Sequence, residues 1–376
     1  MGAHASLRAL ARIDLGAIER NCAHLCSLAG GGTELCAVVK ADGYGHGATE
    51  SARAALAGGA TWLATATADE ATALRDAGLD GALLVMGALT GADADAALAA
   101  RADVVVWEPA FARALAERVG EGAAPARVHV KLDTGMGRLG AIDAEQARAV
   151  AEIAAADERL ELSGVMTHFA TADELGDDHF PAQLERFTAF AQELRAAHPG
   201  IVVHAANSAA TYRDPASHFD MVRCGIAIYG LDPFGEDPAP RGLEPALSLE
   251  SAVGAVRRFE PGWSAGYGRR WSASEPTWVA TLPIGYGDGW RRGDAGDGRE
   301  ALIGGRRCPL VGTVSMDNVT ADLGPETAVE PGDPALLIGA QGDERILCEE
   351  VARRLGTINY EVTTALTARV ARVSER

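Results

Sequence analysis

Short runs of consecutive apolar residues recur up to about residue 230, and amphipathic segments separate them. Such runs are typical of strands buried on both faces, whereas apolar residues spaced three or four apart are typical of helices. We predict strands at residues 35–39, 62–66, 83–86, 104–107, 128–132, 162–167, 201–205 and 222–229. We predict helices from about residue 14 and at 48–56, 70–77, 110–119, 144–153 and 183–196. Eight alternating units favour a closed (β/α)8 barrel over an open sheet.

The character of the chain changes after residue 229, where residues 231–240 form a linker rich in turn residues. Strand-like runs follow at 247–259, 278–283, 308–316 and 335–338, with one helix at 347–355. The sequence therefore predicts an α/β protein, with an N-terminal (β/α)8 TIM-type barrel followed by a C-terminal mostly-β domain. We place the barrel at 13–236 and the β domain at 237–376, and expect residues 1–12 to pack with the β domain.

The 376 residues carry a formal net charge of −18. So acidic a chain lacks the basic face that nucleic acid or an anionic membrane surface requires, and we expect neither as a partner. No apolar run is long enough to span a bilayer, and no signal peptide precedes the first strand, so we expect a cytoplasmic protein. The six cysteines form no CxxC pair or Cys/His cluster, so we expect reduced thiols and no metal site.

The most informative stretch is residues 36–47, an apolar strand that ends in Lys40 and runs into a glycine-rich turn carrying Tyr44. Burial of the lysine stem disfavours the ammonium form, so the pKa falls and the amine becomes a nucleophile. Such an amine is what a Schiff-base lysine needs. For this stretch alone, a surface lysine at the end of a strand is the other interpretation.

Other reactive side chains follow the remaining strands. In a barrel, the carboxyl ends of the strands meet at one face, where catalytic residues collect. The residues predicted there include Lys40, Tyr44, Lys131, Arg138, His168, Ser208 and Arg223. The hydroxyls of Tyr44 and Ser208, with backbone amides near Gly225, would suit a phosphate group. A phosphate holder beside a Schiff-base lysine suggests pyridoxal phosphate.

One competing motif is residues 135–140, Gly-Met-Gly-Arg-Leu-Gly, which match the dinucleotide-binding fingerprint. Two polar residues separate it from its strand, and the next helix is predicted to begin near Asp143. The motif also lies in the fifth βα unit, not in the first. We therefore favour pyridoxal phosphate. Glycine-flanked tyrosines at 266–268 and 285–287 stay open between a binding role and a structural one.

Together these motifs resemble the alanine racemase family of fold-type III pyridoxal-phosphate enzymes. The cofactor-lysine motif is Val-Lys-Ala-Asp-Gly-Tyr-Gly-His-Gly at 39–47, and the motif of the opposing base is Gly-Tyr-Gly at 266–268. The resemblance extends from residue 12 to residue 370. It implies a homodimer with shared active sites that uses pyridoxal 5'-phosphate to interconvert L-alanine and D-alanine, which supplies D-alanine for peptidoglycan in the cell wall.

The resemblance also implies a role for each matching residue. Lys40 would carry the cofactor and exchange the α-proton on the D-alanine side, while Tyr267 of the other subunit would serve the L-alanine face. Residues matching phosphate contacts are Tyr44, Ser208, Gly225, Ile226 and Tyr360. Arg223 matches the arginine that faces the pyridine nitrogen, and His168 lies beside it. Residues matching substrate-side positions are Arg138, Tyr286, Met316 and Asp317. Lys131 matches a lysine that is often carbamylated and then holds Arg138.

Two bases on opposite faces of the substrate account for racemisation. Ser315, Gly266 and Gly287 depart from residues frequent in the family, but none of these changes removes a reacting group. The alternatives are a broader-specificity amino-acid racemase and a fold-type III amino-acid decarboxylase, and Arg223 argues against the decarboxylase. A non-catalytic pyridoxal-phosphate carrier would lack the β domain and Tyr267.

Overall fold

The computed structural model describes residues 8–293 and 296–376. Residues 1–7 of the predicted N-terminal segment lie outside the described residues. The chain forms two compact units, one made of Ile18–Ile228 and the other of the segment that ends at Ala17 together with Tyr229–Arg376. The second unit therefore contains both ends of the described chain.

Eight parallel strands close into a barrel in the first unit. They are β2 (Glu34–Val38), β3 (Trp62–Thr65), β4 (Ala82–Val85), β5 (Asp103–Val106), β6 (Ala126–Lys131), β7 (Leu160–Met166), β8 (Val202–His204) and β9 (Met221–Cys224). Pairing of β2 with β9, which sets Cys36 beside Arg223, closes the ring. The predicted (β/α)8 barrel is confirmed, and its strands are almost wholly buried, as near-continuous apolar runs require.

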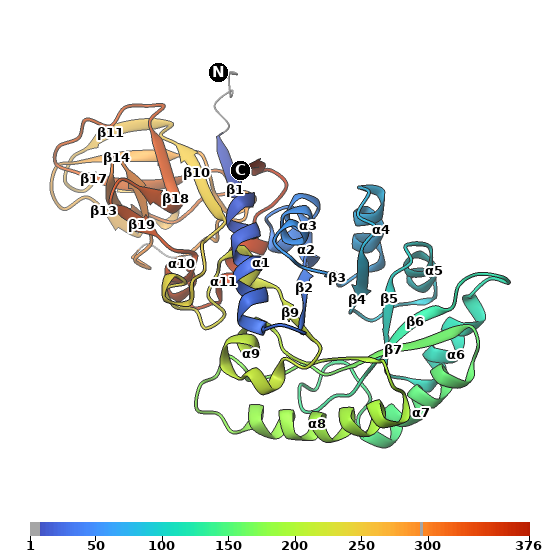
Figure 1. Cartoon of the computed structure of the whole chain (residues 1–376). Coiled ribbons are helices and arrows are strands. Elements are labelled where there is room, and N and C mark those ends of the chain that lie inside the picture. The colour runs from blue at the N-terminus through green and yellow to red at the C-terminus, as the bar shows by residue number, and fades with distance from the viewer. Residues whose placement is uncertain (1–7, 294–295) are drawn as a thin grey trace. The chain divides into compact units, whose positions relative to one another are not determined.

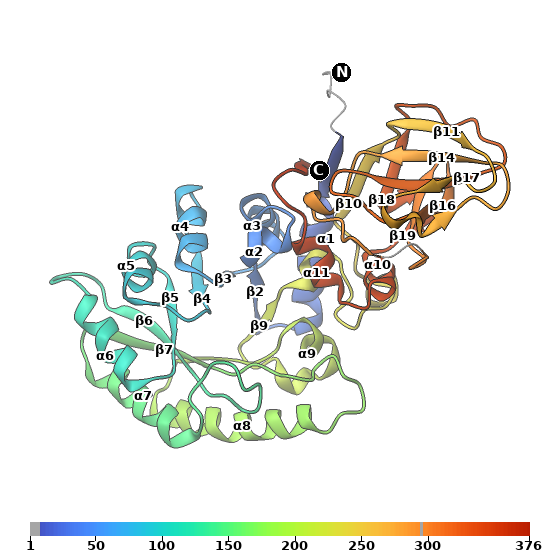
Figure 2. The same ribbon diagram turned by 180° about the vertical axis from the view of Figure 1, so that it is seen from behind.

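Helices follow the strands and lie outside the ring (Figure 1, Figure 2). They are α1 (Leu15–Ala29), α3 (Ala48–Ala57), α4 (Ala68–Asp76), α5 (Gly91–Ala99), α6 (Pro109–Arg118), α7 (Ala144–Ala156), α8 (His179–Ala197) and α9 (Ser208–Arg213). The segment labelled α2 (Lys40–Tyr44) is a turn with left-handed residues and not a regular helix. The sequence does not predict α5. This helix consists mainly of alanine and aspartate and buries only Ala94 and Ala97, so its two faces differ little in polarity.

The predicted strand at 222–229 is wrong in its second half. Strand β9 ends at Cys224, and Ile226–Tyr229 form a 3-10 turn, η2. The amides of Gly225 and Ala227 donate to the Ser208 hydroxyl, at 3.1 and 3.3 Å, in place of a strand partner. An apolar run alone does not distinguish a buried strand from a buried turn.

A mixed sheet dominates the second unit, which confirms the predicted mostly-β domain. The strands lie in the order β11-β14-β17-β16-β15-β18-β10-β1-β20, with β19 beside β18. Their bounds are β1 (Ala9–Asp14), β10 (Leu247–Ala252), β11 (Ala255–Phe259), β14 (Thr277–Leu282), β15 (Glu300–Ile303), β16 (Arg306–Val311), β17 (Val319–Gly324), β18 (Pro334–Gln341), β19 (Glu344–Ile346) and β20 (Ala371–Glu375). A separate pair is β12 (Ser264–Ala265) and β13 (Trp271–Ser272).

Strand β1 pairs with β10 antiparallel and with β20 parallel, so the first described strand belongs to this sheet. The single strand predicted at 247–259 is wrong, because the chain turns at Val253 and Gly254. Their amides donate to Asp333 and Thr281 oxygens, each at 2.8 Å, and divide the run into β10 and β11.

Two helices, α10 (Cys348–Arg354) and α11 (Asn359–Thr364), complete the second unit. The sequence predicts the first of them but not the second. The Asn359 side-chain amide donates to the Asp232 main-chain oxygen at 2.8 Å and to the Glu349 carboxylate at 3.0 Å. Contacts distant in sequence therefore help to hold α11, whose six residues carry little helical signal of their own.

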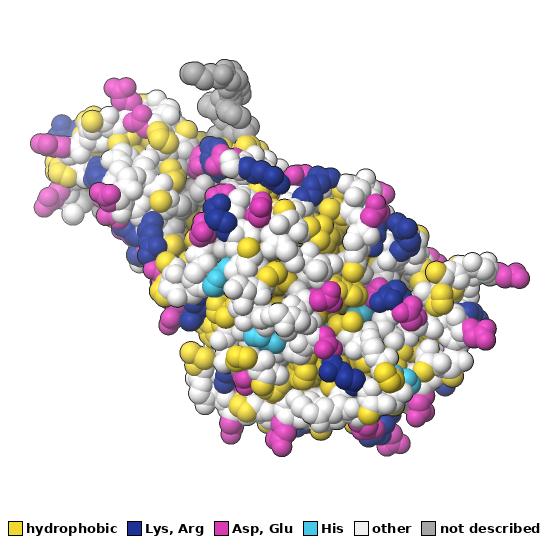
Figure 3. Space-filling model, in the orientation of Figure 1, with side chains coloured by type: hydrophobic (Ala, Val, Ile, Leu, Met, Phe, Trp, Pro, Cys, Tyr) yellow, Lys and Arg dark blue, Asp and Glu magenta, His cyan; other side chains and the backbone are white. Residues whose placement is uncertain are grey.

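Charged side chains of both signs mix on the surface. Figure 3 shows Lys and Arg scattered among Asp and Glu over the visible face. That face is therefore mixed in charge and does not form the basic patch typical of nucleic-acid binding. Within the described ranges, no helix combines the length and apolar character needed to cross a membrane.

Candidate active site

Lys40 lies where β2 ends, and the residues after it have an unusual backbone. Ala41 and Asp42 adopt left-handed conformations, with φ of 53° and 51°. This region costs roughly 1–2 kcal/mol per residue that has a Cβ atom, so other contacts must hold it. The Glu70 carboxylate accepts the Ala41 amide at 2.6 Å, and the Asp42 carboxylate accepts the Ala48 amide at 2.9 Å. Side chains on either side of the turn therefore set where Lys40 lies.

The chain contains two lysines, Lys40 and Lys131, and both lie in the barrel. Burial and then the nearby Arg138 lower the pKa of Lys40, while Glu70 acts in the opposite direction. Burial, followed by the charges of Arg223 and Arg138, lowers the pKa of Lys131 to about 8. Because the neutral amine is the nucleophilic form, both lysines are prepared for chemistry at nitrogen.

Arg223, on β9, is a buried cation. Its guanidinium donates to the main-chain oxygens of Thr167 and Ala205 at 2.8 and 3.0 Å. Two imidazole nitrogens, His204 Nδ1 and His168 Nδ1, lie 2.9 and 3.3 Å from it. Desolvation lowers the pKa of Arg223 to about 10, which leaves the guanidinium protonated near neutral pH.

His168 follows β7 and is surrounded by positive charge. Burial, and then the charges of Arg223 and Lys131, hold the pKa of His168 well below its usual value. The imidazole is therefore neutral near pH 7. Since guanidinium nitrogens only donate, His168 Nδ1 is the acceptor toward Arg223 and the ring proton is on Nε2.

Two hydroxyls and a glycine lie together next to β9. Ser208, the first residue of α9, accepts the Gly225 amide through its hydroxyl at 3.1 Å. A Cβ atom added to Gly225 would lie 2.3 Å from the Tyr44 hydroxyl oxygen, so a larger residue has no room there. Burial raises the pKa of Tyr44, so its phenol stays protonated and can donate. The Ile226 backbone continues from this point as the turn η2.

The loop after β6 is organised by Asp133. Its carboxylate accepts four backbone amides, those of Gly135, Met136 and Gly137, each at 2.8 Å, and of Arg138 at 3.2 Å. These are the amides that a dinucleotide pyrophosphate would need in the competing interpretation. Helix α7 begins only at Ala144, with Asp143 as its N-cap, as predicted. The loop therefore presents the Arg138 side chain and does not form a pyrophosphate cradle.

Positive charge is in excess at this end of the barrel. Lys40, Arg138 and Arg223 each lower the pKa of Lys131, which places four cationic groups within electrostatic reach of one another. Within the described residues, none of the four forms an ion pair with a carboxylate. Such a set, with the Ser208 and Tyr44 hydroxyls, fits an anionic group that carries a phosphate and an aldehyde able to react with an amine.

The remaining predicted site residues lie in the second unit. Tyr267 begins the 3-10 turn η4 (Tyr267–Arg269), and 68% of its surface is exposed. The Thr313 hydroxyl donates to the Tyr267 main-chain oxygen at 3.0 Å, and Gly266 forms a β-bridge with Thr313. Gly266 has φ of 73°, and a Cβ atom there would lie 2.6 Å from the Thr313 nitrogen. The glycine thus allows the turn that projects the phenol.

Tyr286 and Met316 lie on two loops that are joined through their backbones. The Tyr286 amide donates to the Ser315 oxygen at 3.1 Å, and the Gly287 amide donates to the Met316 oxygen at 2.9 Å. A Cβ atom at Gly287 would lie 3.1 Å from the Met316 Cγ atom. Tyr286 and Met316 are therefore held side by side, and both are exposed in the chain.

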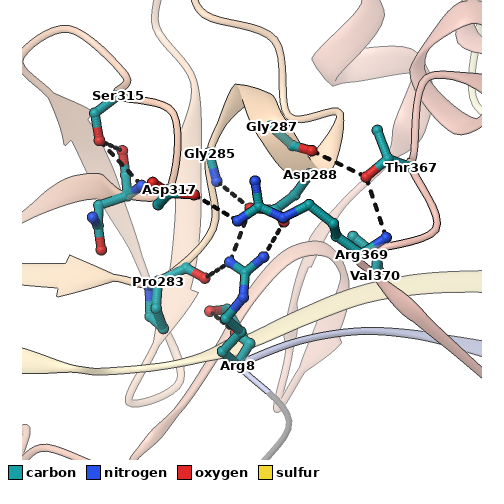
Figure 4. Close-up of polar contacts among 12 residues, drawn as sticks. Arg8, Pro283, Gly285, Gly287, Asp288, Ser315, Asp317, Thr367, Arg369 and Val370 are labelled. Carbon is teal, nitrogen blue, oxygen red and sulfur yellow. Dashed lines mark hydrogen bonds and ion pairs between the residues drawn. The ribbon is translucent and has the colours of Figure 1, made fainter.

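A buried carboxylate anchors these two loops (Figure 4). Asp288 is fully buried; it receives two hydrogen bonds from Arg8, and the Arg369 guanidinium lies 3.3 Å away. Arg369 also pairs with Asp317 at 2.5 Å. Burial acts to raise the pKa of Asp288, but the Arg8 hydrogen bond and the Gly285 amide outweigh it and lower the pKa. The arrangement fixes the Asp317 side chain beside Met316.

The predicted residues thus form two groups. The barrel brings together Lys40, Tyr44, Lys131, Arg138, His168, Ser208, Arg223, Gly225 and Ile226. The second unit brings together the loops of Tyr267, Tyr286, Met316 and Asp317, and carries Tyr360 on α11.

The sequence analysis did not identify the residues that hold the barrel site residues in place. Asp133 and Glu70 bind backbone amides, and His204 contacts Arg223. The available signal for Glu70 was a capping box with Thr67 at the start of α4. For His204 no local signal exists, because its partner comes from another strand.

We predict that Asp133→Ala loosens the loop after β6. A hydrogen bond to a charged acceptor is worth about 1.5–3 kcal/mol, so amide protection over residues 134–139 should fall at least about tenfold. Hydrogen–deuterium exchange measures this directly. Asp143→Ala is the matched control, since the Asp143 carboxylate accepts the Gln146 amide at 2.8 Å and no other amide of the described residues, and this variant should leave residues 134–139 protected. Unchanged exchange in Asp133→Ala would contradict the prediction.

Comparisons with known proteins agree with this geometry. The family model described as alanine racemase, N-terminal domain, matches residues 13–233. The model described as alanine racemase, C-terminal domain, matches residues 246–374. The alanine racemase of Symbiobacterium thermophilum is 41% identical over 367 residues, covering 96% of each chain. That of Geobacillus stearothermophilus is 42% identical over 366 residues, covering 96% of this chain and 92% of the relative.

Solved structures give the same result across both units. The alanine racemase of Streptomyces lavendulae superposes with a TM-score of 0.94 at 35% identity, covering 99% of this chain and 98% of that one. The enzyme of Streptomyces coelicolor gives a TM-score of 0.93 at 38% identity and covers 99% of each chain. With family models matched over nearly the whole length and relatives above 40% identity, this chain belongs to the alanine racemase family, a family of pyridoxal-phosphate-dependent racemases.

Proposed function

We propose that this chain interconverts L-alanine and D-alanine, with pyridoxal 5'-phosphate held by Lys40 as a Schiff base, and so supplies D-alanine for peptidoglycan. The observation that carries the proposal is Lys40 itself. It is one of two lysines in the chain, it follows a buried strand, and burial lowers its pKa. The cytoplasmic location expected from the sequence is part of the same proposal.

The barrel residues suit each part of this cofactor. Tyr44, Ser208 and the backbone at Gly225 and Ile226 would hold the phosphate, with Tyr360 as a further contact. Arg223 would face the ring nitrogen, and because a guanidinium only donates, that nitrogen would stay unprotonated. When bound, the cofactor draws electron density from the substrate α-carbon and makes the α-proton removable.

Two side chains would then move the proton. Because burial lowers the pKa of Lys40, more of its amine is neutral than in an exposed lysine, and that amine would take or give the proton on the D-alanine side. The phenol of Tyr267 would do so on the L-alanine side. Arg138 would bind the substrate carboxylate, and Tyr286, Met316 and Asp317 would border the small methyl group.

Tyr267 would act across a subunit boundary, in a homodimer that shares its active sites. Three features of the second unit support this. Tyr267 is 68% exposed, and Met316 and Tyr286 are exposed as well, although all three are large side chains with apolar surface. Exposed side chains of this kind are typical of surfaces that another protein covers.

We predict that borohydride reduction of the holoenzyme leaves the adduct on Lys40 alone. Only two peptides contain lysine, so mapping has two possible outcomes. Lys40→Ala should lose the adduct and lower kcat on the order of 10³-fold, because both the tether and one base are removed. Lys131→Arg is the matched control and should still carry the adduct on Lys40. An adduct on Lys131, or racemisation retained in Lys40→Ala, would disprove the proposal.

Mixed dimers test the shared site. Lys40→Ala and Tyr267→Phe chains, each nearly inactive alone, are refolded together. A mixed dimer has one site with both changes and one with neither, so activity should return to about a quarter of the wild-type level. If each chain used its own Tyr267, every site would keep a defect and no activity would return.

We propose that Lys131 is carbamylated, as the resemblance implies, and its titration gives a test. The neutral amine would attack carbon dioxide, forming a nitrogen–carbon bond and losing a proton, and the resulting anion could accept from Arg138. With a pKa of about 8, the neutral fraction grows as pH rises toward and through 8. We expect a carbamate signal by 13C NMR in labelled bicarbonate that weakens at lower pH. The signal should persist in Lys40→Arg and vanish in Lys131→Arg; its persistence in Lys131→Arg would refute the assignment.

A further inference from the structure

A line of buried polar side chains runs through the barrel interior, and the proposed reaction does not use most of it. It joins Asp103 at the start of β5, His129 on β6, His204 at the end of β8, and Arg223 on β9. Asp103 Oδ2 lies 3.0 Å from His129 Nε2, and His129 Nδ1 lies 2.8 Å from His204 Nε2. His204 Nδ1 lies 2.9 Å from the Arg223 guanidinium. All four residues are buried, and none exposes more than 4% of its whole-residue surface.

The contact with Arg223 determines which ring nitrogen of each histidine carries the proton. A guanidinium nitrogen only donates, so His204 Nδ1 accepts and its proton must be on Nε2. His204 Nε2 then donates to His129 Nδ1, which leaves the His129 proton on Nε2, where it meets the Asp103 carboxylate. Burial, with the charges of Arg223 and His129, also holds the pKa of His204 well below its usual value, which agrees with a neutral ring.

The barrel makes room for this line. A Cβ atom at Gly164, on the neighbouring strand β7, would lie 2.4 Å from His129 Nδ1. The pairing of β6 with β7 shifts register between Val128 and His129, next to that glycine. The Trp62 ring packs edge-on against the His129 ring, with centroids 5.7 Å apart. The imidazole therefore sits in a space shaped for it.

The line also connects Arg223 with a carboxylate. The contacts of its guanidinium are main-chain oxygens and the two imidazoles, and the described residues place no carboxylate against it. At the other end, Asp103 accepts from the half-exposed Arg127 at 3.1 and 3.2 Å, and Arg127 also pairs with Glu161 at 2.6 Å. Asp103 is thus the charged acceptor that orients both rings.

We propose that Asp103 is a positioning residue for the racemisation: through His129 and His204 it maintains the acceptor that holds the Arg223 guanidinium in place. Without Asp103, the His129 proton can move to Nδ1. His129 Nδ1 and His204 Nε2 would then both carry a proton and repel each other. His204 would relieve this repulsion by moving its proton from Nε2 to Nδ1, where it would face the Arg223 guanidinium. The effect on catalysis rests on the role of Arg223 in the proposed function, whereas the proton order does not.

The proton order is tested in the chain without added cofactor, by 15N NMR of the histidine rings. His129→Gln and His204→Gln identify the signals. In the wild type, both rings should carry the proton on Nε2. Asp103→Ala should change this pattern, while Asp103→Asn, whose amide oxygen still accepts, should preserve it. Glu161→Gln is the matched control, because Glu161 contacts Arg127 but lies outside the line, and it should change neither ring.

Kinetics of the loaded enzyme test the consequence. Removing a residue that orients a functional group through a hydrogen bond typically lowers activity by about 10–100-fold. We therefore expect Asp103→Ala to lower kcat at least about tenfold. KM for alanine should change less, since Arg223 does not bind substrate in the proposed site. Asp103→Asn should recover most of the loss, and Glu161→Gln should match the wild type. If Asp103→Ala fails to fold, the 15N spectra and the kcat values of the wild type and of Asp103→Asn still test the proposal.

A wild-type His204 protonated on Nδ1 would overturn the proposal, as would ring signals unchanged in Asp103→Ala. A changed proton order with unaltered kcat would overturn the positioning role. Failure of the Lys40 reduction experiment would instead refute the proposed function and leave the proton order standing, so the two failures are distinguishable.

Discussion

Positive charges buried beside one another govern the barrel end of this molecule. Burial disfavours the charged form of each lysine, and the neighbouring cations add to that cost, so the pKa of Lys131 falls to about 8 and that of Lys40 falls as well. Burial, and then the charges of Arg223 and Lys131, likewise keep His168 neutral. Buried cations without a counter-charge cost free energy, and a bound anion offsets that cost. A phosphorylated cofactor would therefore bind to a site that is already positively charged.

Carboxylates near this cluster bind the backbone, and among residues 8–293 and 296–376 none of them forms an ion pair with the four cations. Asp133 accepts four amides of its own loop, and Glu70 accepts the Ala41 amide behind Lys40. Had either paired with Arg138 or Lys40, the charge available to a ligand would be neutralised. The Asp133 and Glu70 carboxylates therefore shape the loops, and the positive charge of the cluster stays available to a ligand.

In the second unit the proposed site residues are exposed, whereas those in the barrel are mostly buried. Tyr267, Tyr286 and Met316 project from turns, and glycines at 266 and 287 leave room for close backbone contacts. The buried Asp288, held between Arg8 and Arg369, gives these turns a rigid base. Rigidity before association lowers the entropy lost when a partner covers such a surface.

What the sequence determined by itself is local. Apolar runs alternating with amphipathic segments specify the barrel strands, and the place of Lys40 at the end of the first of them depends only on residue order. The matching motifs around Lys40 and Tyr267 are equally local, so they could be identified without coordinates. Single strands were misjudged where turns interrupt apolar runs, after Cys224, at Val253–Gly254 and after Val311, where the strand predicted at 308–316 already ends. The sequence also did not predict β15, β17, β19 and β20.

Only the tertiary structure decided which distant side chains meet. His129 and His204 carry no motif, yet His204 contacts Arg223 and His129 contacts His204, because strand register aligns three different strands of a closed ring. Asn359 likewise reaches the Asp232 main-chain oxygen, which is distant in sequence, through packing that residue spacing does not encode. The physical reason is that periodicity specifies which face a side chain is on. Its partner across the barrel depends on register, chain closure and the room left by residues such as Gly164.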